Sequence, residues 1–153
     1  MPVTNRPWEA LAPGERWRGQ WETRIAEMPP LPVLAARGKA DGPVLLVTGG
    51  VHGDEYEGPA AIARLFQELE RPLQRGMLQG LPVVHGAARA AHSRAGPVDG
   101  VDLNRAFPGS HEPDGISTPA LAHAVFETFV RRCDALIDLH SGGAALVHLP
   151  LAG

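Results

Sequence analysis

The sequence predicts an α/β fold in which helices flank a mixed, partly parallel sheet. Three observations support this class. A short, continuous apolar run at residues 44–47 has the length and β-branched content of a strand that is buried on both faces. Two segments with apolar residues at helical spacing follow it, beginning near Pro59 and Thr118. Further strands predicted around these helices give the alternation typical of a sheet whose strands run at least partly in parallel.

The length and composition are those of one globular domain. The 153 residues are enough to bury a core, and the apolar fraction of 44% argues against disorder. The 18 glycines and 15 prolines indicate a fold rich in tight turns. With 14 basic against 17 acidic residues, no positive surplus exists to follow a phosphate backbone, so no nucleic-acid partner is expected.

The single cysteine, Cys133, excludes an intramolecular disulfide and a cysteine-based zinc cluster. It lies in an apolar periodic segment, so we expect a buried structural thiol rather than a nucleophile. Residues 1–17 carry charges and prolines where a signal peptide needs an apolar core, and no apolar stretch is long enough to span a bilayer. We therefore expect a soluble, cytoplasmic protein without membrane contact. The sequence leaves its oligomeric state open, a homo-oligomer included.

The chain divides at about residue 30 into two expected parts. Residues 1–30 are predicted to be a polar lead-in with an edge strand, and residues 31–153 the N-terminal part of the main domain. Alternation of apolar and polar residues indicates the edge strand, and short apolar runs predict the others. The predicted strands cover residues 19–28, 32–36, 44–47, 81–85 and 135–139, with a further strand beginning at Ala145.

Two helices are predicted between these strands. Pro59 suits a first helical position, and apolar residues recur after it at helical spacing. The second helix has Thr118 as its predicted N-cap and Pro119 in its first position. Residues 86–117 between the helices are dense in Gly, Pro, Ser, Asn and Asp and are expected to form a loop. A loop of this length is uncommon unless it has a function.

The first candidate site is the loop that follows the apolar run at residues 44–47. It places His52 and Glu55 three residues apart on a turn that enters a helix, where both side chains can face one point. Zn²⁺ readily accepts one imidazole and one carboxylate. Pairs with this spacing also arise by chance, and a solvated loop with incidental charges is the alternative. The glycines on both sides and the position after a buried strand favour a site.

A second candidate residue, His140, ends the strand predicted at 135–139. Ligand sites in open α/β sheets collect at the carboxyl ends of strands, so His140 is expected to project into the same crevice as the first loop. For His140 alone, a core histidine with its hydrogen bonds satisfied would be the better interpretation; His52 and Glu55 nearby reverse it. Two His and one Glu with an open position form the ligand set of catalytic zinc hydrolases, and predict one Zn²⁺ per chain.

The third candidate element lies inside the long loop. Asn104 and Arg105 can grip a carboxylate, because arginine offers a planar two-pronged donor and asparagine an additional amide. Arg94 can polarise a carbonyl or stabilise an oxyanion. Asp102 is a candidate acceptor for the second ring nitrogen of a ligand histidine, a contact that fixes the tautomer and the ring direction. A turn held by Asp and Asn capping bonds explains any one of these residues, but not the two arginines.

Together the three motifs resemble the succinylglutamate desuccinylase/aspartoacylase family, a branch of the zinc carboxypeptidase superfamily. They are His52-Gly-Asp-Glu55, Asp102-Leu-Asn-Arg105 and Asp138-Leu-His140-Ser-Gly, which occur in the family's order within a match from about Leu31 to Gly143.

The resemblance implies a zinc-carboxypeptidase-like fold and a zinc-dependent deacylase, an amidohydrolase that cleaves a small N-acyl amino acid with metal-activated water. It also implies roles for individual residues. Asn104 and Arg105 would hold the substrate carboxylate, and Arg94 would activate the scissile carbonyl. The implied zinc ligands are His52, Glu55 and His140.

One departure from the family concerns the general base, which in the family is a Glu well downstream of the last zinc ligand. Only residues 141–153 follow His140 here, and none is acidic. The sequence therefore resembles the N-terminal half of the catalytic domain, incomplete at its C-terminus, and the alternative function is a truncated, catalytically inactive zinc-binding fragment. A two-metal phosphoesterase, suggested by Asp138-x-His140, is disfavoured because the bridging ligands that such sites need are missing.

Overall fold

One five-stranded sheet organises the chain in the computed structural model, which describes residues 6–110 and 117–152 apart from 24, 26 and 27. The strands are β1 (Arg16–Trp21), β2 (Leu31–Arg37), β3 (Ala40–Gly49), β4 (Arg75–Leu81) and β5 (Ala135–Leu139). Their order in the sheet is β1-β2-β4-β3-β5. β3 pairs in parallel with β4 and β5, whereas β2 is antiparallel to β1 and β4. The predicted mixed, partly parallel sheet is confirmed.

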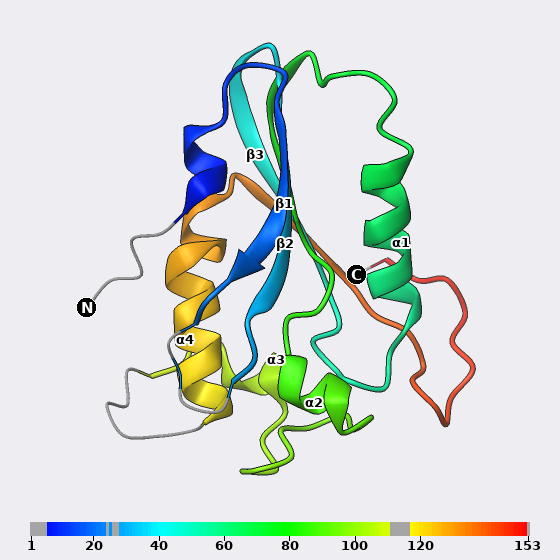
Figure 1. Cartoon of the computed structure of the whole chain (residues 1–153). Helices are drawn as coiled ribbons and strands as arrows, with labels where there is room; N and C mark the ends of the chain where they lie inside the picture. The colour runs from blue at the N-terminus through cyan, green and yellow to red at the C-terminus, as the bar shows by residue number, and fades with distance from the viewer. Residues whose placement is uncertain (1–5, 24, 26–27, 111–116, 153) are drawn as a thin grey trace.

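The two longer helices cover opposite faces of the sheet, α1 one face and α4 the other (Figure 1). Two short helices, α2 and α3, lie in the long segment between them. The helices are α1 (Glu57–Gln67), α2 (Gly86–Ala90), α3 (Leu103–Ala106) and α4 (Thr118–Thr128), with 3-10 turns at Pro7–Ala10 and Val130–Arg132.

The larger part of the core lies between the sheet and α4. Trp8 stacks on Phe129 with ring centroids 5.2 Å apart, and Trp21 meets the same ring edge-on at 5.1 Å. All three side chains are buried. A smaller cluster, centred on Ile62 of α1 and Val47 of β3, fills the opposite face. The sheet is thus fixed from both sides in its central part.

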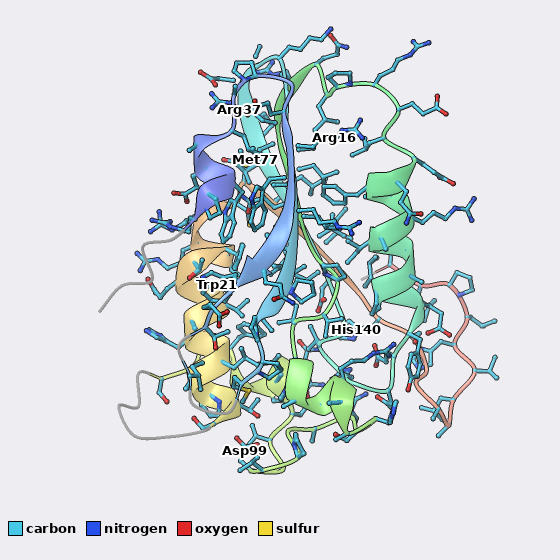
Figure 2. All side chains as sticks on the ribbon, in the orientation of Figure 1. Arg16, Trp21, Arg37, Met77, Asp99 and His140 are labelled. Carbon is cyan, nitrogen blue, oxygen red and sulfur yellow. The ribbon has the colours of Figure 1, made fainter. Side chains whose placement is uncertain are left out.

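β3 and β5 end at the same level of the sheet, since Gly49, the last residue of β3, pairs with Leu139, the last residue of β5. Because the two strands are parallel, the chain leaves both of them in the same direction, as expected of a ligand site in an α/β sheet. Figure 2 shows His140 and Asp99 at this end of the molecule.

Two predicted strands are displaced along the chain, and the strand predicted at 44–47 is longer, residues 40–49 of β3. The edge strand predicted at 19–28 is β1, residues 16–21, where Trp17 alternates with exposed arginines; residues 24, 26 and 27 lie outside the described part. The strand predicted at 81–85 is β4, residues 75–81. A glycine, Gly80, interrupts the apolar pattern of this strand. A side chain does not fit there, because a Cβ would lie 2.7 Å from the Phe66 ring of α1.

Other local expectations are also corrected. Residues 86–110 are not wholly loop, since they include α2 and α3. The N-cap of α4 is Ser117, whose hydroxyl accepts from the Ala120 N–H, rather than Thr118. No strand begins at Ala145 in the described residues, because residues 144–152 are exposed and irregular.

Cys133 is half-buried rather than buried. Its Sγ donates to the Val130 carbonyl at 3.2 Å, and burial is the main cause that raises the pKa of the thiol. Both features fit a structural role.

Within the described part of the chain, no helix has the length and apolar character needed to cross a bilayer. The cytoplasmic location and the division of the chain at residue 30 stay predictions.

Candidate metal centre

The loop after β3 carries His52 and Glu55 into the interior, where both are buried. Gly50 turns the chain with φ +60°, and Gly53 lies so close to the backbone of Ala88 that a Cβ would collide with it. The loop is therefore folded tightly against α2 before it enters α1. His140 follows β5 directly and lies beside this loop.

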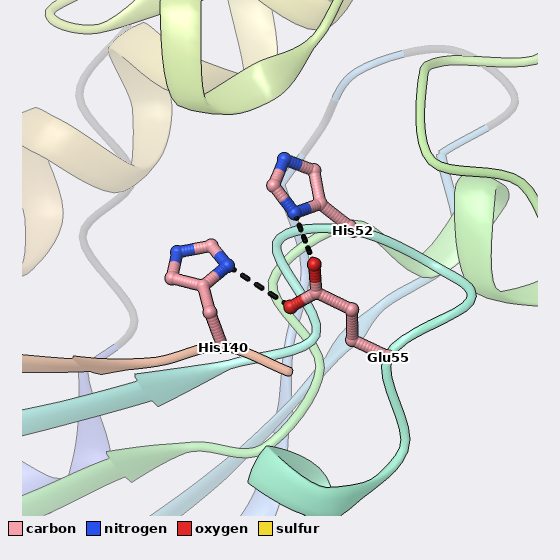
Figure 3. Close-up of side chains that lie close together, drawn as sticks. All are labelled: His52, Glu55 and His140. Carbon is pink, nitrogen blue, oxygen red and sulfur yellow. Dashed lines mark hydrogen bonds and ion pairs between the residues drawn. The ribbon is translucent and has the colours of Figure 1, made fainter. Parts of the chain in front are cut away.

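The three side chains converge on one point (Figure 3). Nδ1 of His52 lies 2.7 Å from Oε1 of Glu55, and Nδ1 of His140 lies 3.0 Å from Oε2 of the same carboxyl group. One nitrogen or oxygen atom from each residue lies within 4.8 Å of the others. The structure thus brings together the three residues predicted as ligands.

Each imidazole has a second carboxylate on its other nitrogen. Nε2 of His52 lies 3.0 Å from Oδ1 of Asp102, as the sequence predicted, and Nε2 of His140 lies 2.7 Å from Oδ2 of Asp138. Carboxylates in this position fix the tautomer and ring direction of metal-binding histidines. Nδ1 of both rings is consequently directed at Glu55.

The orienting role of Asp138 was not predicted from the sequence. The signal that could have found it is its spacing, since residues two apart at a strand end share one face. Thr48 of β3 holds this carboxylate from behind, with its hydroxyl donating to Oδ1 of Asp138 at 2.7 Å.

The carboxylates around the histidines shape the charge of the site. The hydrogen bond with Asp138 is the main cause that raises the pKa of His140 to about 8, against partial burial, which lowers it. Partial burial of Asp102 works to raise its pKa, but hydrogen bonds from His52 and from the Asn104 N–H outweigh it and leave the pKa below its usual value. Asp102 therefore stays ionised beside His52.

Arg94 lies at the open side of this cluster, with its side chain 55% exposed. Its guanidinium nitrogens are 3.6 Å from Oε1 of Glu55 and 3.4 Å from Oδ2 of Asp102. Asn104 and Arg105 are exposed on α3, which begins where Asp102 accepts from the Asn104 N–H at 2.9 Å. Among the described residues, neither side chain forms a hydrogen bond or ion pair with the three converging groups.

The donor set fits a zinc ion. Two imidazoles and one carboxylate, with one side open and each histidine oriented from behind, match the pattern of catalytic zinc sites. The open side is where Arg94 lies, so a bound molecule there would face both a metal and a cation.

The fold and this cluster define an α/β domain with a candidate metal site at the carboxyl ends of two parallel strands. A model of the succinylglutamate desuccinylase/aspartoacylase catalytic domain matches residues 41–153. The chain belongs to this family, and the resemblance read from its motifs is confirmed.

Several known proteins are similar to the chain. N-alpha-acetyl-L-2,4-diaminobutyric acid deacetylase of Halomonas elongata is 39% identical over 122 residues, which are 80% of this chain and 35% of that relative. The crystal structure of an aspartoacylase family protein from Mesorhizobium loti matches with a TM-score of 0.72 and 34% identity over 86% of this chain and 41% of that one. The product-bound ectoine utilization protein EutE (DoeB) of Ruegeria pomeroyi matches with a TM-score of 0.68 and 32% identity, covering 83% and 40%.

A metallo-carboxypeptidase from Pseudomonas aeruginosa matches with a TM-score of 0.57 and 22% identity over 74% of this chain and 32% of that one. This likeness shows the fold alone and confirms the predicted zinc-carboxypeptidase-like architecture. The chain spans between about a third and two fifths of the length of these four proteins.

Proposed function

We propose that this chain is the metal-binding part of a zinc-dependent deacylase that cleaves the amide bond of a small N-acyl amino acid. The observation that carries the proposal is the convergence of His52, Glu55 and His140 from two neighbouring strand ends, each histidine backed by a carboxylate. Membership of the family supports the reaction class. The name of the Halomonas elongata relative, a deacetylase of an N-acetylated amino acid, supports the substrate class.

His52, Glu55 and His140 would hold one zinc ion. Bound zinc supplies a water of lowered pKa and an electrophile for the carbonyl oxygen. Asp102 and Asp138 keep Nδ1 of the two imidazoles directed at the ion. They also raise the basicity of the rings, which strengthens them as ligands.

The arginines would bind the substrate from its two ends. Arg94, within ion-pair distance of Glu55 and Asp102, is placed to stabilise negative charge as it develops on the scissile carbonyl oxygen. Arg105 and Asn104 are exposed and available for the substrate carboxylate, which suits the planar fork of an arginine. Arg94 would thus act at the reacting bond, and Arg105 at the anchoring group.

A zinc-binding fragment without turnover is the second candidate function, and the contacts of Glu57 favour it. This carboxylate, next to the ligand loop, accepts a hydrogen bond from the Ser141 hydroxyl, the main cause that lowers its pKa. A carboxylate held in this way is a poor proton acceptor, and a positioned acid or base contributes about 10²–10⁴-fold to such reactions.

The test measures zinc content and release of free amino acid on one preparation, against a panel of N-acetyl amino acids. We expect zinc to bind and turnover to stay near background, because Glu57, the carboxylate next to the ligand loop, is engaged by the Ser141 hydroxyl. Robust turnover that a chelator abolishes would show that the chain carries its own base. A preparation that takes up no zinc would contradict both candidate functions.

A further inference from the structure

Tyr56 makes two contacts at the rim of the metal centre that the proposed mechanism does not use. It follows Glu55 directly, and the residue is 41% exposed. Its hydroxyl lies 2.7 Å from Nδ1 of His92, and the guanidinium carbon of Arg89 lies 3.8 Å from the centre of its ring. Three side chains from two separate segments thus meet around one exposed aromatic ring.

His92 adopts a backbone conformation that side-chain-bearing residues rarely take. Its φ of +51° lies in the left-handed region, which it shares in the described chain only with glycines. Strained residues of this kind persist where surrounding contacts hold them, and they cluster at functional sites. The contact with Tyr56 is one such restraint. Another is the hydrogen bond from the Ser93 N–H to the Ala88 carbonyl at 3.0 Å.

The strained residue lies two positions before Arg94, and Tyr56 lies one position after Glu55. The Gly53 N–H also donates to the Ser93 carbonyl at 2.8 Å, so the ligand loop and the segment of Arg94 are joined by backbone as well as by side chains. The Arg94 side chain itself is exposed and reaches its two carboxylates only at 3.4–3.6 Å. Its direction therefore depends on how its backbone is held.

We propose that Tyr56, through its hydrogen bond with His92 and its stacking with Arg89, is a positioning residue for Arg94. It ties the backbone of residues 92–94 to the ligand loop, so that the guanidinium of the exposed Arg94 side chain stays directed at Glu55 and Asp102. The inference rests on the proposed role of Arg94 at the carbonyl oxygen. It adds that the geometry of this arginine is set by residues that do not themselves reach the reacting bond.

A double-mutant cycle tests this role with methylphosphonate, whose tetrahedral anionic oxygens mimic the charge that Arg94 would meet. Its affinity for the zinc-loaded chain is measured by calorimetry for wild type, Tyr56→Phe, Arg94→Ala and the double variant. We expect a loss of about tenfold for Arg94→Ala, since charge-assisted hydrogen bonds are of this strength. Tyr56→Phe should lose several-fold, and the double variant no more than Arg94→Ala alone.

Two further measurements separate positioning from loss of structure. His92→Gly tolerates the positive φ but removes the imidazole. It should lower the affinity for methylphosphonate to the same extent as Tyr56→Phe does. In the metal-free chain, the Nε–H signal of Arg94 should exchange with solvent faster in Tyr56→Phe than in wild type. Unchanged exchange together with full probe binding by His92→Gly would overturn the inference.

The outcomes also distinguish this inference from the proposed function. Equal affinity of wild type and Arg94→Ala for the probe would overturn the proposed role of Arg94 and the inference with it. An effect of Arg94→Ala that adds fully to that of Tyr56→Phe, or an absent effect of Tyr56→Phe, would overturn the inference alone.

Discussion

His52 and His140 share an arrangement in which one ring nitrogen faces Glu55 and the other faces an aspartate. The aspartates come from different places, Asp102 from the N-cap of α3 and Asp138 from the C-terminal end of strand β5. A ligand that is oriented from behind is already in the geometry that the metal requires. The side chains then lose their conformational freedom when the chain folds, so ordering them does not weaken metal binding.

The role of Asp138 gives a prediction for metal affinity. Asp138→Ala frees the His140 ring to rotate, so zinc affinity should fall about 10–100-fold, the usual effect of losing such a partner. Competition with a chromophoric chelator measures this affinity. Asp41→Ala is the control, because Asp41 is an exposed aspartate whose side chain pairs with Arg37. Equal losses in the two variants would show that Asp138 acts only through general charge.

Arg105 gives a prediction for substrate binding. Arg105→Lys keeps the charge but loses the planar fork, so affinity of the zinc-loaded chain for an N-acetyl amino acid should fall at unchanged net charge. Arg105→Ala should in addition lose the preference for the free acid over its carboxamide. Both affinities are read by calorimetry, with Arg16→Lys on β1 as the control. If Arg105→Ala prefers the free acid as strongly as wild type does, another residue binds the carboxylate.

The candidate ligands could be found from the sequence because chemistry and position coincide in them. His52 and Glu55 follow a buried strand among glycines, where charges serve packing poorly, and His140 ends a second strand. Asp138 is different: an aspartate before a histidine at a strand end is equally consistent with a solvated residue. Only the pairing of β5 with β3, which brings Thr48 to its other oxygen, fixes its direction.

At the scale of elements, the long segment before α4 is anchored by a row of hydrogen-bonded polar groups, of which His85 and Thr118 are buried and Asp99 is exposed. Nδ1 of His85 accepts from the Ala88 N–H at 3.3 Å, and Nε2 lies 3.3 Å from the Thr118 hydroxyl, which donates to Asp99 at 3.0 Å. With Nδ1 as acceptor, Nε2 carries the proton and His85 is neutral. These hydrogen bonds join α2, the loop around Asp99 and the start of α4.

His85 gives a prediction for stability against pH. Burial is the main cause that lowers its pKa below the ordinary 6.5, opposed by the charge of Asp99. Only the unfolded chain then takes up this proton as the pH falls below 6.5, so the histidine makes unfolding easier in acid and has no effect above that range. In His85→Gln, the free energy of unfolding of the metal-free chain should fall less between pH 7.5 and 5.

Urea unfolding at the two pH values measures this difference. His148→Gln is the control, since His148 is exposed. The free energy of unfolding of this control variant should change with pH as that of the wild type does. A wild-type slope in His85→Gln as well would show that His85 is not the titrating group.

The elements of the fold were predictable where hydrophobic pattern and burial agree, as at residues 44–47, in α1 and in β5. They were displaced where small residues replace the pattern. β4 contains Gly76 and Gly80, which are needed for close approach of β3 and α1, and the apolar residues that follow it place the predicted start of the strand six residues too far downstream. In β1, arginines alternate with tryptophans, and one tryptophan is buried in a core whose other members are distant in the sequence.

At the scale of the whole molecule, the two edges of the sheet differ. β1 is an edge strand with charged side chains on one face, as natural edges often are. β5 is also an edge, but it is parallel and apolar, and Leu136 and Ile137 are 46% and 48% exposed. Parallel strands are ordinarily covered on both faces. Leu146, Val147, Leu149 and Leu151, after β5, are also exposed.

The apolar edge predicts self-association of the chain. Ile137→Lys places a charge on β5, so it should shift the protein toward monomer in sedimentation equilibrium while leaving zinc stoichiometry intact. Val98→Lys is the control, because Val98 is 64% exposed but lies in the loop before α3. If wild type and Ile137→Lys associate to the same degree, the β5 edge does not cause association.

Zinc stoichiometry tests most directly whether the ends of β3 and β5 form one metal site. Purified chain is loaded with zinc, freed of excess by dialysis and measured by elemental analysis, beside His52→Ala, His140→Ala and the exposed control His148→Ala. We predict one equivalent in wild type and His148→Ala, and background in the other two variants, because each removes one of three ligands. Full zinc content in His52→Ala or His140→Ala would contradict the metal site.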